Sequence, residues 1–284
     1  MEAGLPMDAH FSPAFGGTSP ATIAGSLVAG NSEMLSSVVL YQLIRPGTRV
    51  LAFYTISGPL NMKTGNLAFG DIGASLAQAA VNQLWRRYGL PVLNCAGGCS
   101  SSKSPDYQCA YEKAVPTLIS ALSGANLISF HGCIYGEVSY HPVQAILDDD
   151  VAGMIGRFLE GIAVNDETLA VDLINDVGPM GHFLDKDHTL KWWKLEQFMP
   201  RASDRLSYPR WVERGKKSCL DYARERMKEI LATHKPKRLT SSQEADIERI
   251  LEEARSYYKS KGLITDSEMA VYRESMKSPD YPYG

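Results

Sequence analysis

The sequence lacks the features that would point to a membrane or a nucleic acid. Its uninterrupted apolar runs fall short of the ~20 residues that a membrane-spanning helix needs. The first residues contain no basic segment followed by an apolar one, as a secretory signal would. The net charge is −3, without the excess of lysine and arginine typical of nucleic-acid binding. We therefore expect a cytoplasmic protein that binds neither membranes nor nucleic acids.

Cysteine is also scarce. The five cysteines are an odd number without the spacing of a disulfide framework, so we expect free thiols in a reducing compartment. The remaining composition, with 44% hydrophobic and 21% charged residues, is that of an ordinary globular protein with a sizeable core. The length of 284 residues suits one barrel-sized domain or two smaller ones.

A unit of strand, loop and helix repeats four times in the first 177 residues. We expect strands at 7–11, 49–56, 90–95 and 125–130, and helices at 20–45, 71–88, 106–123, 142–163 and 165–177. Buried strands that alternate with helices predict an α/β fold with a parallel sheet. Four such units would be the C-terminal half of a TIM (β/α)8 barrel. A small open doubly wound sheet is the alternative, although no strand is followed by a dinucleotide-binding glycine fingerprint.

The character of the sequence changes near residue 178. A connector rich in glycine, aromatic and charged residues comes first, and charged amphipathic helices are expected at 209–233 and 241–260. We therefore divide the chain into a partial TIM barrel at 1–177 and a connector with a C-terminal helical region at 178–284. The last residues, SPDYPYG, are expected to be frayed.

Several stretches carry a family resemblance. In chain order they are SPATIAGSLVAGNSEMLSSVVLYQLIRPG, NMKTGNLAFGD, YGLPVLNCAGGCSSSKSPDYQCAYEKA, LSGANLISFHGCIYGE, QAILDDDVAGMIGRFLEGI, NDETLAVDLINDVGPMGHFLDKDHTL and PRASDRLSYPRWVERGKK. Together they extend over nearly all of residues 3–255. In this order they resemble the trimethylamine methyltransferase family, which comprises corrinoid-dependent methylamine and quaternary-amine methyltransferases.

The resemblance implies a TIM barrel that transfers a methyl group from a methylated amine to the Co(I) of a corrinoid (cobalamin). The corrinoid belongs to a separate corrinoid protein, and no cofactor is bound permanently. Members of the family are much longer, so this chain would lack roughly the first four strands. It would then need its N-terminal half, a homo-oligomer or a split-gene partner. The trimethylamine enzymes also carry pyrrolysine, which is not written here; its expected equivalent lies near Cys99. A quaternary amine such as glycine betaine is therefore favoured over trimethylamine.

Candidate substrate-binding residues follow from the chemistry of such a substrate. A quaternary ammonium ion has no N–H group to donate, so aromatic faces and fixed negative charge must recognise it. The aromatic candidates near the expected strand ends are Phe15, Tyr54 and Tyr135. Lys63, in the loop after the second expected strand, and Asn94, the penultimate residue of the third, are candidates by their position. Tyr135 and Phe15 lie in polar, glycine-rich loops, whereas aromatic residues near strand ends more often belong to the core.

Three residues are candidates for a catalytic role: His131, Glu137 and Cys99. His131 follows a strand directly and would bind a substrate carboxylate or a corrinoid group, with a structural histidine as the alternative. Glu137 would balance the ammonium charge or orient His131, unless it is a solvated loop acid. Cys95, Cys99 and Cys133 with His131 are the candidate ligands of a zinc ion, which needs a tetrahedral set. The C-x3-C spacing of Cys95 and Cys99 is loose, which favours free thiols. The alternatives to a corrinoid-dependent transferase are thus an incomplete fragment or a zinc-dependent methyltransferase.

Overall fold

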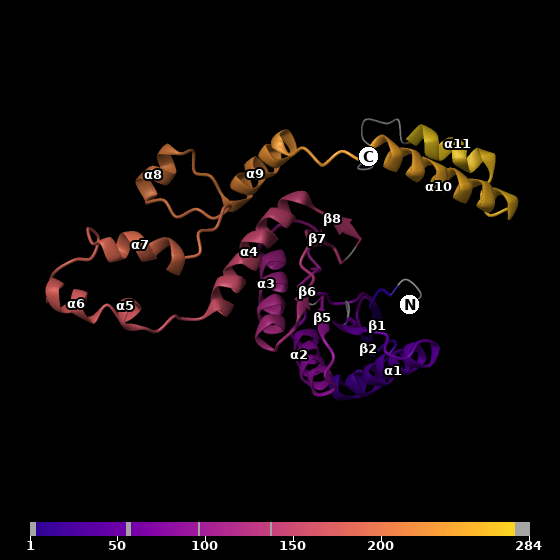
Figure 1. Ribbon diagram of the computed structural model, residues 1–284, viewed down its shortest axis with the longest axis horizontal. Coiled ribbons are helices and arrows are strands. Elements are labelled where there is room, and N and C mark those ends of the chain that lie inside the picture. Colours follow the sequence, from indigo (N-terminus) through magenta and orange to yellow (C-terminus); the bar gives the residue numbers. More distant parts are fainter. Residues whose placement is uncertain (1–3, 55–57, 96, 137, 276–284) are drawn as a thin grey trace. The chain divides into compact units, whose positions relative to one another are not determined.

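The computed structural model describes residues 4–54, 58–95, 97–136 and 138–275 (Figure 1). The chain divides into two compact units, residues 1–232 and residues 233–284. The second unit contains α10 (Ser241–Ser260) and α11 (Asp266–Ser275). The domain boundary that we predicted after residue 177 lies within the first unit, at the end of α6 (Val171–Val177), and stays a prediction.

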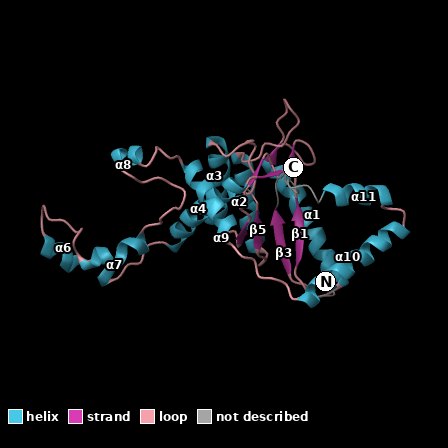
Figure 2. Ribbon diagram, turned by 90° about the horizontal axis from the view of Figure 1, so that it is seen from above, coloured by secondary structure: helices cyan, strands magenta, loops and turns pink. Residues whose placement is uncertain are grey.

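A four-stranded parallel sheet forms the centre of the first unit and confirms the α/β class. Its strands are β1 (Met7–Phe11), β3 (Val50–Tyr54), β5 (Val92–Asn94) and β6 (Leu127–Ile128). They are hydrogen-bonded in that order, and Figure 2 shows β1, β3 and β5 side by side. Each lies inside its predicted range. Strand order follows chain order without the reversal of a doubly wound sheet, so the sheet is compatible with part of a barrel.

Four helices alternate with these strands: α1 (Ile23–Ile44), α2 (Ile72–Arg87), α3 (Tyr107–Leu122) and α4 (Pro142–Glu160). The first three begin where the side chain of Thr22, Asp71 or Asp106 accepts a hydrogen bond from a backbone N–H of the first turn. Each helix contacts the next, so the four form a row along the sheet (Figure 1).

The main core lies between the sheet and this row of helices. Alternate strand residues such as Ala9, Ala52 and Val92 are fully buried there, and Trp85 of α2 is equally buried against them. Their neighbours along the strands, such as His10 and Phe53, lie on the opposite face and are more exposed. Because successive side chains point to opposite faces of the sheet, one face packs against the helices and the other is more exposed.

Helix α1 has an apolar composition that matters for localisation. By length and composition it is the one helix, among the residues described, that could cross a membrane. Asn31, Ser32 and Glu33 interrupt its apolar residues, which is why the sequence shows no continuous run. The helix packs against β1 and α2, and its Met34 is buried. Most of its apolar side chains are exposed, and a single helix of this kind near the N-terminus is weak evidence for a membrane segment.

Several smaller elements were not predicted from the sequence. Strand β2 (Ala14–Phe15) pairs in parallel with β4 (Gly58–Pro59), and β7 (Cys133–Ile134) pairs in antiparallel fashion with β8 (Ser139–Tyr140). Helix α7 (Asp187–Glu196) lies in the predicted connector.

Two predicted helices are each divided in two. The helix expected at 165–177 separates into α5 (Asp166–Leu169) and α6 at Ala170, which has a φ of 50°. The helix expected at 209–233 separates into α8 (Tyr208–Glu213) and α9 (Cys219–Thr233) at Gly215 and Lys216, both with positive φ. A residue with positive φ cannot continue a right-handed helix, which explains both breaks. The SPDYPYG tail lies outside the described residues.

Candidate functional site

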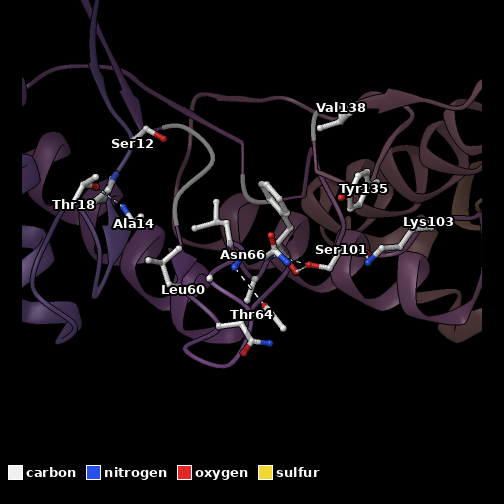
Figure 3. Close-up of a pocket in the computed structure, with 16 residues that line it drawn as sticks. Ser12, Ala14, Thr18, Leu60, Thr64, Asn66, Ser101, Lys103, Tyr135 and Val138 are labelled. Atoms are coloured by element: carbon white, nitrogen blue, oxygen red, sulfur yellow. Dashed lines mark hydrogen bonds between the residues drawn. The ribbon is translucent and has the colours of Figure 1, made fainter.

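A pocket of about 740 Å³ opens at the carboxyl ends of the parallel strands (Figure 3). Its walls come from the segment after β1, from the turn between β4 and α2, and from the loops after β5 and β7. The lining residues used below are Phe69, Ser101, Lys103 and Tyr135. Strand ends are where the sequence predicts the site, because loops at this edge of a parallel α/β fold converge.

Tyr135, a predicted substrate-binding residue, lines the pocket with half of its surface exposed. Its φ of 49° is unusual for a non-glycine residue. The Tyr135 N–H donates to the carbonyl of Ser102 at 2.6 Å, and the Gly136 N–H donates to the carbonyl of Ser100 at 2.7 Å. These bonds hold the strained loop against its neighbour. Strain of this kind is commonly found at functional sites.

Lys103 lies beside Tyr135 and was not predicted from the sequence. Its Nζ is 5.1 Å from the centroid of the Tyr135 ring and donates to the Ser101 carbonyl at 2.7 Å. Figure 3 shows the three side chains along one wall. Among the described residues that line the pocket, Lys103 alone carries a charge. Its place between a strand end and a helix, in the turn CAGGCSSSK, was the signal that could have found it.

Glu112 of α3 fixes the loop that carries Ser101 and Lys103. The buried Glu112 carboxylate accepts hydrogen bonds from Ser100 Oγ at 2.6 Å, from the Ser101 N–H at 2.8 Å and from Gln108 Nε2 at 2.8 Å. Ser101 Oγ in turn accepts from the Phe69 N–H at 3.0 Å, which ties in the turn before α2. A carboxylate with several donors is a strong local anchor because its charge strengthens each hydrogen bond.

Lys113, the next residue of α3, fixes a second pair of loops from inside the protein. Its Nζ lies 2.8 Å from Asp148 Oδ2 of α4, and both side chains are almost fully buried. The same ammonium group donates to the carbonyls of Gly98 at 3.1 Å and Cys133 at 3.0 Å. Burial raises the pKa of the Asp148 carboxyl above its usual value, and the Lys113 charge acts in the opposite direction. We call Glu112 and Lys113 together the α3 anchor.

Three of the predicted substrate-binding residues face the core instead of the pocket, and their binding role stays a prediction. Asn94 is fully buried and its Oδ1 accepts from Asn82 Nδ2 of α2 at 2.8 Å. Tyr54 is buried with its ring 5.9 Å from that of Phe11. Phe15 is buried in the same core. The pleat explains the first two, because both lie on the helix-facing side of their strands.

The other candidate residues that the structure describes do not line the pocket. Cys99 is buried, His131 is exposed next to Gly98, and Lys63 is exposed in the turn that begins at Asn61. Their catalytic or binding roles stay predictions. Glu137 lies outside the described residues.

The geometry does not support the zinc alternative. Within residues 4–54, 58–95, 97–136 and 138–275, no group of three or more His, Cys, Asp or Glu side chains is arranged to hold a metal ion. Cys95, Cys99, Cys109, Cys133 and Cys219 are free of disulfides. Burial raises the pKa of Cys109 to about 11, so this thiol stays protonated near neutral pH.

Sequence comparisons give the relatives of the chain. It matches the trimethylamine methyltransferase (MTTB) family over residues 9–255. It is 35% identical to the trimethylamine methyltransferase MttB of Methanosarcina thermophila over 234 residues, which cover 82% of this chain and 48% of the relative. It is 34% identical to the glycine betaine methyltransferase of Desulfitobacterium hafniense strain Y51, with 83% of this chain and 49% of the relative covered.

A further relative is the trimethylamine methyltransferase MttB of Desulfitobacterium hafniense strain DSM 10664 / DCB-2, 34% identical over 90% of this chain and 51% of the relative. The chain thus spans about half the length of the curated relatives that it matches. The family match extends over most of the sequence and includes every element that forms the pocket. The chain therefore belongs to the trimethylamine methyltransferase family.

Proposed function

We propose that this chain acts in an amine methyltransferase that moves a methyl group from a methylated amine to the Co(I) of a corrinoid protein. Family membership is the observation that carries the proposal, since relatives are named for trimethylamine and glycine betaine methyl transfer. The position of the pocket at the strand ends supports it, because this is where such folds bind substrates. A cytoplasmic location without membrane or nucleic-acid binding stays a prediction.

We also propose that the parallel sheet is part of a TIM barrel whose other strands lie outside residues 1–284. The unreversed strand order and the more open second face of the sheet support this arrangement. Helix α1 supports it as well, because apolar side chains such as Val28 and Leu43 are mostly exposed. Burial of these surfaces would stabilise an assembly of the two parts.

The residues of this chain would act mainly by positioning the substrate. The rings of Tyr135 and Phe69 offer aromatic faces to N-methyl groups. A corrinoid on a docked carrier protein would supply the Co(I) nucleophile that accepts the methyl group, and the amine would leave with the electrons of the broken C–N bond. The chain then needs no nucleophile of its own, and its contribution is orientation and exclusion of water.

The test is the visible absorbance of a Co(I) corrinoid protein mixed with the chain and a panel of methylated amines. Appearance of methyl-Co(III) with one amine supports the proposal, and its absence in every mixture contradicts activity of the chain alone. Repeating the assay with the N-terminal half of a relative then separates an incomplete chain from an inactive one. Once methyl transfer is detected, we expect Tyr135→Ala to lower kcat/KM by about tenfold, because it removes an aromatic face that contacts the N-methyl groups. Tyr257→Ala is the matched control, because Tyr257 is exposed to a similar extent and also has a lysine over its ring.

A further inference from the structure

We propose that Lys103 makes the pocket selective for a methylated amine that also carries a carboxylate, in preference to a simple ammonium ion. The inference rests on the proposed function, because it concerns the substrate class of the same pocket. It assigns a specificity-determining role to a residue that sequence reasoning did not single out.

The first step concerns the aromatic face that a methylated ammonium ion would use. The Lys103 Nζ already lies over the Tyr135 ring, 5.1 Å from its centroid. The hydrogen bond from Nζ to the Ser101 carbonyl, 2.7 Å long, holds the ammonium group within its own loop. On the other side of the contact, backbone hydrogen bonds from Tyr135 and Gly136 to Ser102 and Ser100 hold the loop that carries the ring. A ligand cation that approaches this ring therefore meets a lysine that the loop keeps in place.

The second step concerns charge. The other described side chains that line the pocket are neutral, and none of them is an acid that would balance Lys103. A ligand cation over the Tyr135 ring would lie near the Lys103 ammonium group, and like charges repel each other. A simple tetramethylammonium or trimethylammonium ion would add a second positive charge to the pocket. A ligand with its own carboxylate removes that penalty, because the carboxylate pairs with the Lys103 ammonium group.

The third step concerns size. In glycine betaine a single methylene separates the trimethylammonium nitrogen from the carboxylate carbon, so both charges lie within a few ångströms of each other. The cavity of about 740 Å³ is large enough for this ligand to reach Lys103 with its carboxylate and an aromatic ring with its methyl groups. Phe69, whose N–H donates to Ser101 Oγ, supplies a second ring in the pocket lining.

The experiment compares two ligands of nearly the same shape, glycine betaine and its methyl ester, in which the carboxylate charge is removed. Isothermal titration calorimetry of the full chain measures the affinity for each at low ionic strength. We expect the wild-type chain to bind glycine betaine at least tenfold more tightly than the ester. Lys103→Met should abolish this preference by weakening betaine binding, and Lys103→Arg should keep it. Lys194→Met is the matched control, because Lys194 also lies over an aromatic ring, that of Trp193, but outside the pocket.

Three results would overturn the inference: no measurable binding of betaine to the wild-type chain, equal affinities for betaine and ester, or a Lys103→Met variant that weakens both ligands alike. The outcome is separable from that of the proposed function, because the binding measurement involves no methyl transfer. A charge preference without methyl-Co(III) formation leaves Lys103 as a carboxylate ligand and removes the methyltransferase assignment. Methyl transfer from trimethylamine alone, without a charge preference, supports the methyltransferase assignment and removes the role proposed for Lys103.

Discussion

Replacing Lys113 by methionine tests whether the α3 anchor stabilises the fold through its charge. Methionine keeps much of the apolar volume of the side chain but removes the ammonium group. The variant loses the ion pair with Asp148 at 2.8 Å and the hydrogen bonds to the carbonyls of Gly98 and Cys133. Asp148 is then left buried without a cation. We expect a loss of about 3–5 kcal/mol in the free energy of unfolding, the range for a buried pair that loses one partner.

A double-mutant cycle distinguishes the charge from simple loss of packing. Asp148→Asn removes the negative charge and keeps an acceptor for Gln144, which donates to Asp148 Oδ1 at 2.7 Å in the native chain. We expect the double variant Lys113→Met/Asp148→Asn to be more stable than Lys113→Met alone by about 2 kcal/mol, because no unpaired buried charge remains. The assay is urea unfolding at pH 7, followed by the fluorescence of tryptophans that include the buried Trp85.

The pH dependence of the Lys113→Met variant gives an independent check with a definite sign. Burial raises the pKa of Asp148 in the folded chain, so the folded state holds this proton at a pH where the unfolded chain has lost it. Without Lys113 to oppose it, that pKa should rise further. The difference in the free energy of unfolding between the wild-type chain and Lys113→Met should therefore be small at low pH. It should grow as the pH rises through the pKa of Asp148 in the folded chain. The reasoning would be refuted if Lys113→Met lowers the free energy of unfolding by less than about 1 kcal/mol at pH 7, or if the losses of the two single variants simply add in the double variant. Lys228→Met is the control: this residue lies on an exposed face of α9, and its replacement should lower the free energy of unfolding by no more than about 0.5 kcal/mol.

Two further predictions concern packing and thiol chemistry. Gly30→Ala in α1 should destabilise the fold by about 1–3 kcal/mol in urea unfolding, since an added Cβ would lie 1.8 Å from the buried Phe11 ring. The matched change Gly156→Ala in α4, where nothing lies within 4 Å, should instead be neutral or stabilise by up to about 1 kcal/mol; equal effects at both positions would contradict this account. Mass spectrometry after iodoacetamide treatment at pH 8 should find Cys219 alkylated and Cys109 intact, because Cys219 is exposed whereas burial raises the Cys109 pKa to about 11. Alkylation of Cys109 at the rate of Cys219 would show that this part of α3 opens readily.

The sequence predicts the order of strands and helices well because apolar runs and helix stops mark each unit. Strand β1 matches its predicted bounds, and the other three strands of the sheet fall inside theirs. The start of α1 was placed three residues too early, at Pro20. The helix begins at Ile23 because the Thr22 side chain accepts a hydrogen bond from the Gly25 N–H.

The candidate site was harder to predict, because position along a strand does not fix the direction of a side chain. Asn94 and Tyr54 are at strand ends, as predicted, but a shift of one residue changes the face of the sheet, and both point toward the helices. Tyr135 lies in the pocket because it belongs to a loop that other loops hold in place. Glu112 and Lys113 carried a signal that was missed: they share the buried face of α3 with Cys109 and so needed buried partners.

The α3 anchor has a consequence for how the pocket responds to change. Through Glu112 one turn of α3 holds the loop after β5 and, by way of Ser101, the turn before α2; through Lys113 it holds the segment that leads to Tyr135. Three walls of the pocket thus depend on the position of a single helical turn. A displacement of α3 would alter all three together, so we expect the pocket walls to respond as a unit. Ligand affinity should then follow the local stability of α3, and amide hydrogen exchange in this helix would report on occupancy of a pocket that the helix itself does not line.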